Sequence, residues 1–367
     1  MAAPQFVRYL VAALGVLLVL VAARSVIGTV VVPRPVSSWL TRGIDRLVNI
    51  TFQLATRRTA NYRRRDRVLS AQAATVLLSQ IVIWLLLFYV GYSLILWPFV
   101  DGGITTAFSN AGPALWAIGE AHEHGAAERA ILDIAALTSL VTVTLQIAYL
   151  PTLYSAFNSR ETEVALLNAR AGLPAWGPEL LVRTHFGLGS GTSTLDRLPQ
   201  LYADWERLAA DITESHTTYP VLVRFRSPKP LSSWVTALLA VVDSAAMLLA
   251  LSPGRAPTVT ARLCLRSGFL CFNEIAAAMG LRVPGEFERG GISVTYEEFL
   301  DAIAELRAVD FPIERDPKDA WPDFVGWRVN YEKAAYGIAE AVDAPPALWS
   351  GPRRFPGAAI PPIRPPL

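Results

Sequence analysis

Charged residues are scarce in this sequence. Asp, Glu, Lys and Arg make up 17% of the 367 residues, whereas ordinary soluble domains carry about 25%. Hydrophobic residues reach 52%, so part of the chain is expected in a membrane. The deficit lies in residues 1–156, while residues 157–343 have the dispersed charge of a soluble domain. The net charge of +2 gives no broad basic surface, and no nucleic-acid partner is expected.

Cysteine is nearly absent, and so are the motifs of catalysis. Cys264 and Cys271 are seven residues apart in an expected helix, about 10 Å along its axis, which is too far for a disulfide bond. The glycine-rich run at residues 187–193 lacks the preceding strand and the lysine of a phosphate-binding loop. His185 and His216 stand alone, and no hydrolase elbow, zincin pair or paired-cysteine motif occurs. We therefore expect no enzyme activity, no catalytic residue and no cofactor.

Three long apolar runs are present instead. Residues 73–97 carry no charge, and residues 130–150 carry only Asp133. Both runs exceed the roughly 20 residues that cross the hydrocarbon core of a bilayer. Residues 6–32 form the third run, in which Arg24 is the single charge after Arg8. Each run predicts a transmembrane helix.

The charges beside these runs predict the orientation of the chain. Residues 33–72 contain nine arginines against two acids, and the positive-inside rule assigns such a segment to the cytoplasm. Within it, residues 40–54 have apolar side chains on one helical face, which predicts an amphipathic helix on the inner leaflet; a cytosolic linker helix is the alternative. We expect a multi-pass protein of the cell inner membrane with a cytosolic C-terminus.

The remainder predicts a helical cytosolic domain and a tail, so the expected fold class is all-α. Helical periodicity marks residues 161–171, 178–186, 198–215, 231–251, 258–279, 295–308 and 318–342, and residues 219–225 predict one short strand. Residues 231–251 are long enough to cross a membrane, but we expect a core helix because no basic asymmetry flanks them. Residues 344–367 contain eight prolines and predict a disordered tail. The expected parts are thus 1–32, 33–72, 73–156, 157–343 and 344–367.

A short apolar segment separates the second and third membrane runs. Residues 102–119 carry no charge, yet they are too short and too rich in Gly and Pro to span a bilayer, which predicts a re-entrant loop. Acidic residues lie on both sides of this segment in the sequence. Among them, Asp101 and Glu123 are expected at the external mouth of a pore, where their negative charges would concentrate cations. Residues 120–124 also include two histidines, but surface loops gather such residues without binding a metal, so no metal site is expected.

The helix after this loop has a polar stripe. Ser139, Thr142 and Gln146 recur at intervals of three and four residues, which places them on one helical face. Such a stripe suits a water-filled pore or hydrogen-bonded packing between helices. Pro151, near the inner end, could kink this helix or mark its exit from the membrane.

This order of elements resembles the pore module of two-transmembrane potassium channels. The chain is also similar to uncharacterised bacterial membrane proteins that are described as related to such channels. The family's pore segment has an Ala-Phe pair, about nine residues, and a filter of the type Thr-Val-Gly-Tyr/Phe-Gly. The corresponding residues here are Ala107 and Phe108, then 109–116, then Ala117, Ile118, Gly119, Glu120 and Ala121.

The resemblance covers residues 36–156 and implies a homotetramer with a pore. It places Ala117, Ile118, Gly119 and Glu120 at the pore constriction, with Ser139, Thr142 and Gln146 lining the path. Ala117 replaces the filter threonine, Glu120 replaces the aromatic residue, and Pro113 falls inside the pore helix, so potassium selectivity does not transfer.

Two classes of function remain open from the sequence. The first is conduction of monovalent cations through an oligomeric pore, with a cytosolic regulatory domain and membrane lipid as a further partner. The second is a non-conducting, membrane-anchored scaffold or sensor in which the pore-like hairpin only drives assembly. A membrane enzyme is a third and weaker reading, since the sequence locates no pocket for one.

Overall fold

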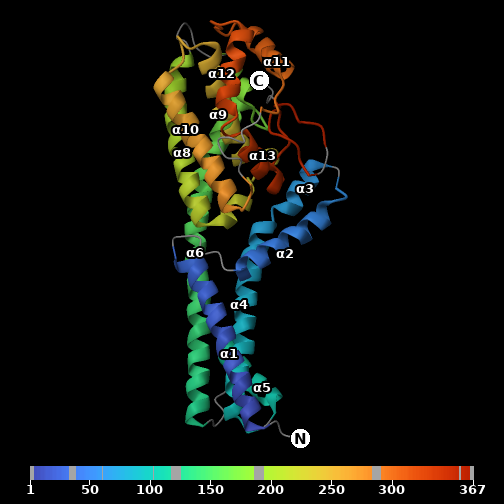
Figure 1. Cartoon of the computed structure of the whole chain (residues 1–367), viewed down its shortest axis with the longest axis vertical. Helices are drawn as coiled ribbons and strands as arrows, with labels where there is room; N and C mark the ends of the chain where they lie inside the picture. The colour runs from blue at the N-terminus through green and yellow to red at the C-terminus, as the bar shows by residue number, and fades with distance from the viewer. Residues whose placement is uncertain are drawn as a thin grey trace. The chain divides into compact units, whose positions relative to one another are not determined.

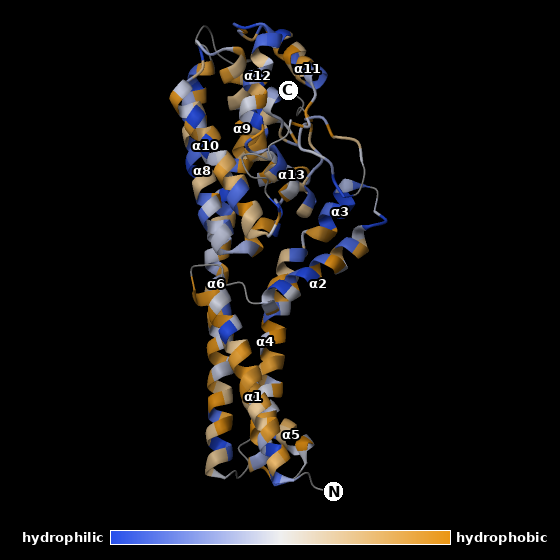
Figure 2. Ribbon diagram, in the orientation of Figure 1, coloured by the Kyte–Doolittle hydropathy of each residue, from blue (hydrophilic) through white to orange (hydrophobic). Residues whose placement is uncertain are grey.

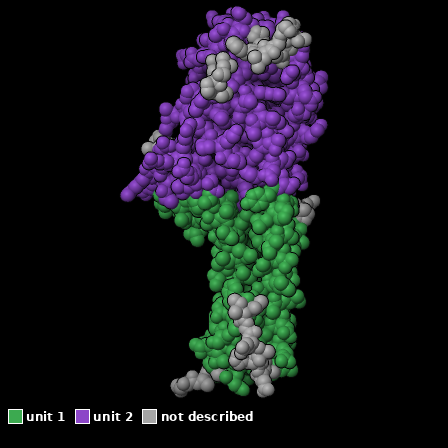
Figure 3. All heavy atoms as spheres, turned by 180° about the vertical axis from the view of Figure 1, so that it is seen from behind, with its two compact units in different colours: residues 1–54, 71–154 green, residues 55–70, 155–367 purple. Residues whose placement is uncertain are grey.

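A computed structural model describes residues 4–32, 39–59, 61–101, 103–116, 125–185, 194–282, 291–354 and 357–363. These residues form helices and connecting segments, and none of them lies in a β-strand. The chain divides into two compact units (Figure 3). Unit 1 comprises residues 1–54 and 71–154, and unit 2 comprises residues 55–70 and 155–367. The all-α expectation is confirmed.

Unit 1 contains the long apolar helices (Figure 1). Its helices are α1 (Gln5–Val26), which continues as a π-helical turn (Ile27–Val31), α2 (Trp39–Thr56, to residue 54), α4 (Gln72–Leu96), a 3-10 turn (Trp97–Phe99), α5 (Ile104–Trp116) and the first part of α6 (Ala126–Ala171). Figure 2 shows that apolar residues dominate α1 and α4. Both helices agree closely with the predicted membrane runs.

Helices α1 and α4 pack closely because each has a glycine where they cross. A Cβ on Gly15 would lie 2.5 Å from the carbonyl oxygen of Gly91, and one on Gly91 would lie 2.7 Å from a methyl group of Val19. A polar pair adds to this contact: the indole Nε1 of Trp84 donates to Ser25 Oγ at 3.0 Å, and both side chains are buried. Small residues and buried hydrogen bonds of this kind hold membrane helices together, where the hydrophobic effect gives no drive for association.

Unit 2 is a helical domain built around α9. Its helices are α3 (Tyr62–Leu69), the second part of α6, α7 (Gly177–His185), α8 (Leu198–Thr218), α9 (Trp234–Leu251), α10 (Thr258–Ala278), α11 (Tyr296–Arg307), α12 (Pro317–Arg328) and α13 (Glu332–Ala341), with 3-10 helices at Thr194–Arg197 and Pro220–Arg224. Helices α7, α8, α10, α12 and α13 all pack against α9, and every residue of α9 is buried.

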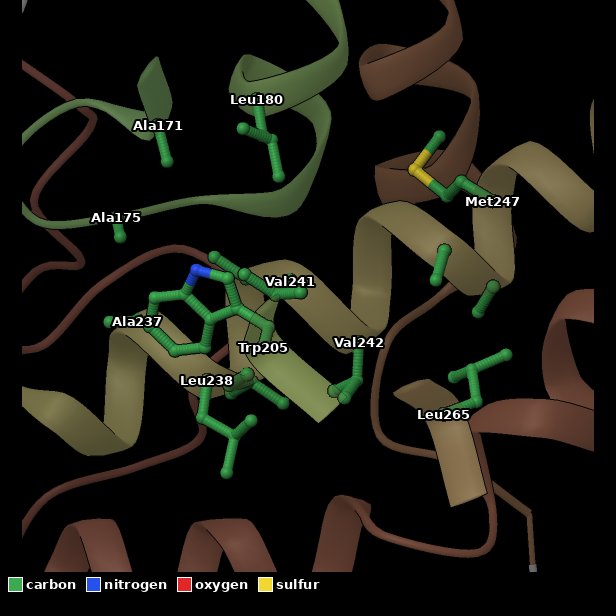
Figure 4. Packing of buried hydrophobic residues seen from close by; sticks show 14 of the residues in the cluster. Ala171, Ala175, Leu180, Trp205, Ala237, Leu238, Val241, Val242, Met247 and Leu265 are labelled. Atoms are coloured by element: carbon green, nitrogen blue, oxygen red, sulfur yellow. The ribbon is translucent and has the colours of Figure 1, made fainter. Parts of the chain in front are cut away.

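The core of unit 2 interlocks side chains from several of these helices (Figure 4). The indole of Trp205 on α8 lies beside Ala237, Leu238 and Val241 of α9. A Cβ on Gly268 of α10 would lie 2.3 Å from Val242, so the absence of a side chain there lets α10 approach α9. The expectation that residues 231–251 form a core helix thus agrees with the burial of every residue of α9, Trp234–Leu251.

Four described helices are long and apolar enough to cross a membrane, by length and composition. They are α1 with its π-helical turn, the region Tyr62–Phe99 that includes α4, the long α6, and α9. In the most apolar stretch of each of the first three helices, at most 39% is buried inside the structure, whereas the corresponding stretch of α9 is 100% buried. These spans indicate a multi-pass membrane protein, and burial separates α9 from the other three.

Three details of the predicted helical domain differ in the structure. Residues 219–225 do not form a strand; Pro220–Arg224 is a 3-10 helix, because Pro220 removes a backbone donor and fits the first turn of a helix. Residues 318–342 form two helices, α12 and α13, with Val329, Asn330 and Tyr331 between them. Residues 130–150 and 161–171 belong to one helix, α6, which continues through Pro151.

Residues 344–354 also differ from the expected disordered tail. The Arg353 guanidinium donates to five backbone carbonyl groups, those of Ala344, Pro345, Ser350, Gly351 and Pro352. Burial lowers the pKa of Arg353 to about 10, and the side chain stays charged at neutral pH. The carbonyl groups that proline-rich segments normally leave to water are here collected around one cation.

Candidate functional site

The predicted pore constriction lies outside the described residues. Ala117, Ile118, Gly119 and Glu120 belong to residues 117–124, as does Glu123 of the predicted mouth. Asp101, the other mouth residue, is described and its side chain is exposed. The roles assigned to these residues stay predictions.

Helix α5 occupies the place of the predicted pore helix. Its Ala107, Ala111 and Leu115 side chains are buried, and the hydroxyl of Tyr89 on α4 donates to the carbonyl oxygen of Phe108 at 3.1 Å. The helix contains Pro113 and still runs to Trp116. Among the described residues it forms a short helix packed on α4, and a pore loop is not shown.

The polar stripe on α6 is buried within unit 1. Ser139, Thr142 and Gln146 are 6%, 3% and 5% exposed. Ser139 Oγ donates to the carbonyl oxygen of Leu115, the penultimate residue of α5, at 2.7 Å. Thr142 Oγ1 donates to the carbonyl oxygen of Thr138 in the preceding turn at 2.7 Å. Ser139 thus makes a helix-packing bond inside its own chain.

Gln146 differs from the other two residues of the stripe. Its Oε1 atom is buried and has no hydrogen-bond partner among the described residues. A buried amide oxygen without a partner costs about 1–3 kcal/mol. A hydrogen bond from a water molecule or from a polar group of another chain would therefore stabilise Gln146.

A second interhelical bond connects α5 to the start of α6. Asn110 Nδ2 donates to Glu128 Oε1 at 2.8 Å, and Glu128 is 9% exposed. Glu128 follows the apolar segment 102–119 in the sequence, close to the predicted mouth residue Glu123. The structure shows that it contributes to packing within unit 1 and that it is not a freely exposed charge.

The outer surface of unit 1 is apolar over much of its length. Large exposed hydrophobic side chains follow one another along α1, α4 and α6, among them Leu10, Leu17, Leu20, Leu78, Leu86, Leu137, Leu140 and Ile147. An exposed apolar surface of this extent is typical of contact with lipid or with another chain.

The strongest polar cluster of unit 2 surrounds Arg328, which is 0% exposed. Its guanidinium forms an ion pair with Asp243 of α9, bonds Glu332 Oε2 at 2.6 Å, and donates to the Trp349 carbonyl oxygen at 2.6 Å. Burial disfavours the charge of Arg328, but the attraction of Asp243 outweighs it and the pKa of Arg328 is raised well above its usual value. The cluster connects α9, α12, α13 and the segment after α13.

Two tyrosine hydroxyl groups add hydrogen bonds to the Arg328 cluster. Tyr331 Oη donates to Asp243 Oδ1 at 2.7 Å, and Tyr336 Oη accepts from Arg328 at 2.9 Å. Burial raises the pKa of Tyr331, and the nearby Asp243 carboxylate raises it further. A buried cluster of ion pairs and hydrogen bonds of this kind specifies how helices pack.

A second buried pair joins Arg160 of α6 to His216 of α8. The Arg160 guanidinium lies 2.7 Å from His216 Nε2 and donates to the carbonyl oxygens of Leu222 and Phe225. Since arginine only donates, Nε2 accepts and the imidazole is neutral. Burial and the positive charge of Arg160 lower the pKa of His216 well below 6.5. The pair fixes the 3-10 helix Pro220–Arg224 against α6.

The sequence did not identify either cluster as important. Neither Arg160 nor Arg328 belongs to a motif or a periodic pattern that marks it in the sequence. Their partners lie 56 to 85 residues away along the chain, as with Arg160 and His216 or Arg328 and Asp243. The one signal available was Asp243 itself, the only charge in an otherwise apolar run, because a buried carboxylate requires a partner.

No group of three or more metal-ligating side chains occurs in the part of the chain that the structure describes. The two cysteines are buried and not bonded to each other. Comparison of the chain with family models, with curated proteins and with solved structures finds no match. The class defined by the fold is therefore a helical, multi-pass membrane protein.

Proposed function

We propose that this chain is a membrane-anchored scaffold or sensor. In this proposal the apolar helices of unit 1 hold the chain in lipid, and the helical unit 2 carries the recognition function. The observation that carries the proposal is the bond from Ser139 to the carbonyl oxygen of Leu115. A hydroxyl expected to line a pore is engaged instead in packing α6 against α5.

The difference in burial between the spans supports the anchoring role. Apolar side chains of α1, α4 and α6 are exposed, as lipid-facing helices require. Helix α9, equally apolar, is enclosed by the helices of unit 2. Three helices are then available to anchor the chain, and the fourth serves as the centre of a folded domain.

The orientation that we propose puts unit 2 in the cytoplasm. The nine arginines of residues 33–72 support it through the positive-inside rule. A membrane-impermeant thiol or amine reagent applied to intact cells should leave a tag at the C-terminus unlabelled. Labelling of that tag without permeabilisation would contradict the orientation.

Cation conduction is the second candidate, and the unpartnered Oε1 of Gln146 favours it. In an oligomer this atom would meet water along a conduction path or a polar group of another copy. The predicted constriction at 117–120, with Asp101 and Glu123 at the mouth, completes this alternative. Conduction would need both an oligomer and a hydrated α6 surface.

A flux measurement separates the two candidates. The full chain is reconstituted into liposomes, and potassium and sodium flux is followed with ion-sensitive dyes, while native mass spectrometry gives the oligomeric state. If the chain is a scaffold, its ion flux should equal that of protein-free vesicles, and Glu120→Gln should give the same flux as the unmodified chain. Flux that falls in Glu120→Gln, and is kept in the exposed-site control Glu297→Gln, would overturn the scaffold and establish conduction.

A further inference from the structure

A cluster of arginines lies on and beside α3, on the surface of unit 2. Residues 55–70 contain six arginines and a single acid, Asp66. Five of these arginines have exposed side chains, and we call them the arginine patch: Arg57, Arg58, Arg63, Arg64 and Arg67.

The packing of α3 within unit 2 determines which of its side chains face outward. Tyr62, Arg65 and Leu69 are buried, and their spacing of three and four residues puts them on one face of the helix. The guanidinium of Arg65 is held inward, since its Nη2 atom donates to Asp343 Oδ1 at 2.9 Å. The arginines of α3 that belong to the arginine patch are thereby fixed on the exposed faces of the helix.

The charge of the arginine patch is not neutralised by its own segment. Asp66, the one acid of this segment, bonds Arg226 Nε at 2.6 Å. No side chain of the arginine patch forms an ion pair with another described residue. Arg67 follows Arg63 by four residues and Arg64 by three, which are spacings at which like charges repel each other on a helix. A negatively charged partner would relieve this repulsion.

The chain keeps the arginine patch close to the first turn of α4. Helix α4 begins at Gln72, five residues after Arg67, and five residues extend over at most about 18 Å. Helix α4 carries no charge and belongs to one of the candidate membrane spans. Helix α2, which precedes the patch in the chain, exposes Trp39, Leu47 and Leu54, as amphipathic helices at a bilayer surface do. The sequence neighbours of the patch are therefore suited to lipid on both sides.

We propose that the arginine patch binds the headgroups of anionic phospholipids. Clusters of about four to eight basic residues next to a membrane span recognise an anionic leaflet, and each residue strengthens binding about fivefold. Guanidinium groups also match the geometry of phosphate oxygens. The proposal rests on the anchoring of unit 1 in lipid, and it adds the class of lipid that the chain recognises.

Fluorescence quenching in nanodiscs tests this surface. The full chain carries Val68→Cys, at a position that is 43% exposed and adjacent to Arg67, and a thiol-reactive dye labels it there because Cys264 and Cys271 are buried. The nanodiscs consist of phosphatidylcholine with a fixed fraction of lipid that bears a nitroxide on its headgroup, which quenches the dye at short range. Replacing part of the phosphatidylcholine by phosphatidylglycerol should increase the quenching. Salt at about 1 M should remove the increase, since it shortens the Debye length to about 3 Å.

Two double variants of equal charge separate the arginine patch from the net charge of the chain. Arg63→Gln/Arg67→Gln should remove most of the increase in quenching. Arg64→Gln alone should raise the phosphatidylglycerol fraction that gives half of the effect about fivefold. The control Arg262→Gln/Arg266→Gln, which changes two exposed arginines of α10, should respond to phosphatidylglycerol as the chain without it does.

The outcomes distinguish the arginine patch from the anchor. If the chain stays in phosphatidylcholine nanodiscs through a high-salt wash, but quenching does not change with phosphatidylglycerol, the proposal is overturned and the anchor stands. Equal losses in the two double variants would overturn it as well, because net charge would then be responsible. Suppression of the increase by inorganic phosphate at constant ionic strength would assign the patch to a soluble anion instead. Loss of the chain from the nanodiscs would contradict the anchoring of unit 1 and this proposal with it.

Discussion

At the scale of single residues, Arg328 makes the largest predicted contribution to stability. Its replacement by Met would leave Asp243 and Glu332 as buried carboxylates without their cation. Removing one partner of a buried ion pair costs about 3–5 kcal/mol. We expect that decrease in the free energy of unfolding, measured by urea denaturation of the full chain with tryptophan fluorescence.

A surface arginine provides the control for this prediction. The side chain of Arg255 is 58% exposed, and its Nε atom lies 3.8 Å from Glu314 Oε1. Such pairs contribute about 0–1 kcal/mol, so Arg255→Met should unfold almost as the unmodified chain does. If both variants had the same small effect, the Arg328 cluster would not have the structural role assigned to it.

His216 gives unit 2 a predictable response to acid. Burial and Arg160 lower its pKa in the folded state, so below about pH 6.5 the unfolded chain binds a proton that the folded chain does not. Stability is therefore full above this pH and falls as the pH decreases toward the folded-state pKa. The variant His216→Gln keeps a hydrogen-bond acceptor but cannot bind a proton. We expect it to reduce the slope of the free energy of unfolding against pH by up to about 1.4 kcal/mol per pH unit.

Urea titrations at several pH values between about 5 and 7.5 measure this slope. The difference between the unmodified chain and His216→Gln isolates the histidine from carboxylates that titrate in the same range. An unchanged slope would mean that His216 is protonated in the folded state, contrary to its bond with Arg160.

At the scale of helices and their ends, the N-terminus of α11 agrees with a prediction from sequence. Thr295 Oγ1 accepts a hydrogen bond from the backbone N–H of Glu298, and the Glu298 carboxylate accepts one from the backbone N–H of Thr295. Thr295→Ala should destabilise the chain by about 1 kcal/mol, since one helix cap contributes that amount. Glu297→Gln, in the same turn but outside the cap, should change the unfolding midpoint in urea much less; equal shifts would argue against the cap.

Helix packing in unit 1 depends on the glycine contact between α1 and α4. Gly15→Val would place atoms where Gly91 and Leu94 already lie, so we expect the two helices to separate and the melting temperature in detergent to fall. Gly43→Ala provides the matched control, because a Cβ there meets nothing within 4 Å. A normal melting temperature for Gly15→Val would show that α1 does not pack on α4.

Helix positions were predictable from the sequence to a much greater extent than side-chain partners. Apolar runs and periodicity located α1, α4, α8, α9 and α10 to within a few residues, since both signals are local. The break between α12 and α13 was missed, because an aromatic stripe at helical spacing continues across it. The Ser139 bond and the Arg328 cluster depend on residues distant in sequence, for which periodicity gives no information.

At the scale of the whole molecule, hydropathy and burial give different answers for α9. By length and composition α9 qualifies as a membrane span, as α1, α4 and α6 do. Its side chains, however, contact other helices of unit 2, including the ion pair of Asp243 with Arg328. A span that faced lipid would have to give up this pairing, which is costly for a buried charge.

A lipid-soluble carbene photoprobe tests this distinction in the full chain. In nanodiscs, mass spectrometry of the labelled peptides should find the probe on exposed apolar residues of α1, α4 and α6, such as Leu17, Leu86 and Leu140. Peptides of α9 should remain unlabelled, because every one of its side chains is buried. Labelling of α9 as strong as that of α1 would place it in lipid, and unit 2 could then not have the core described here.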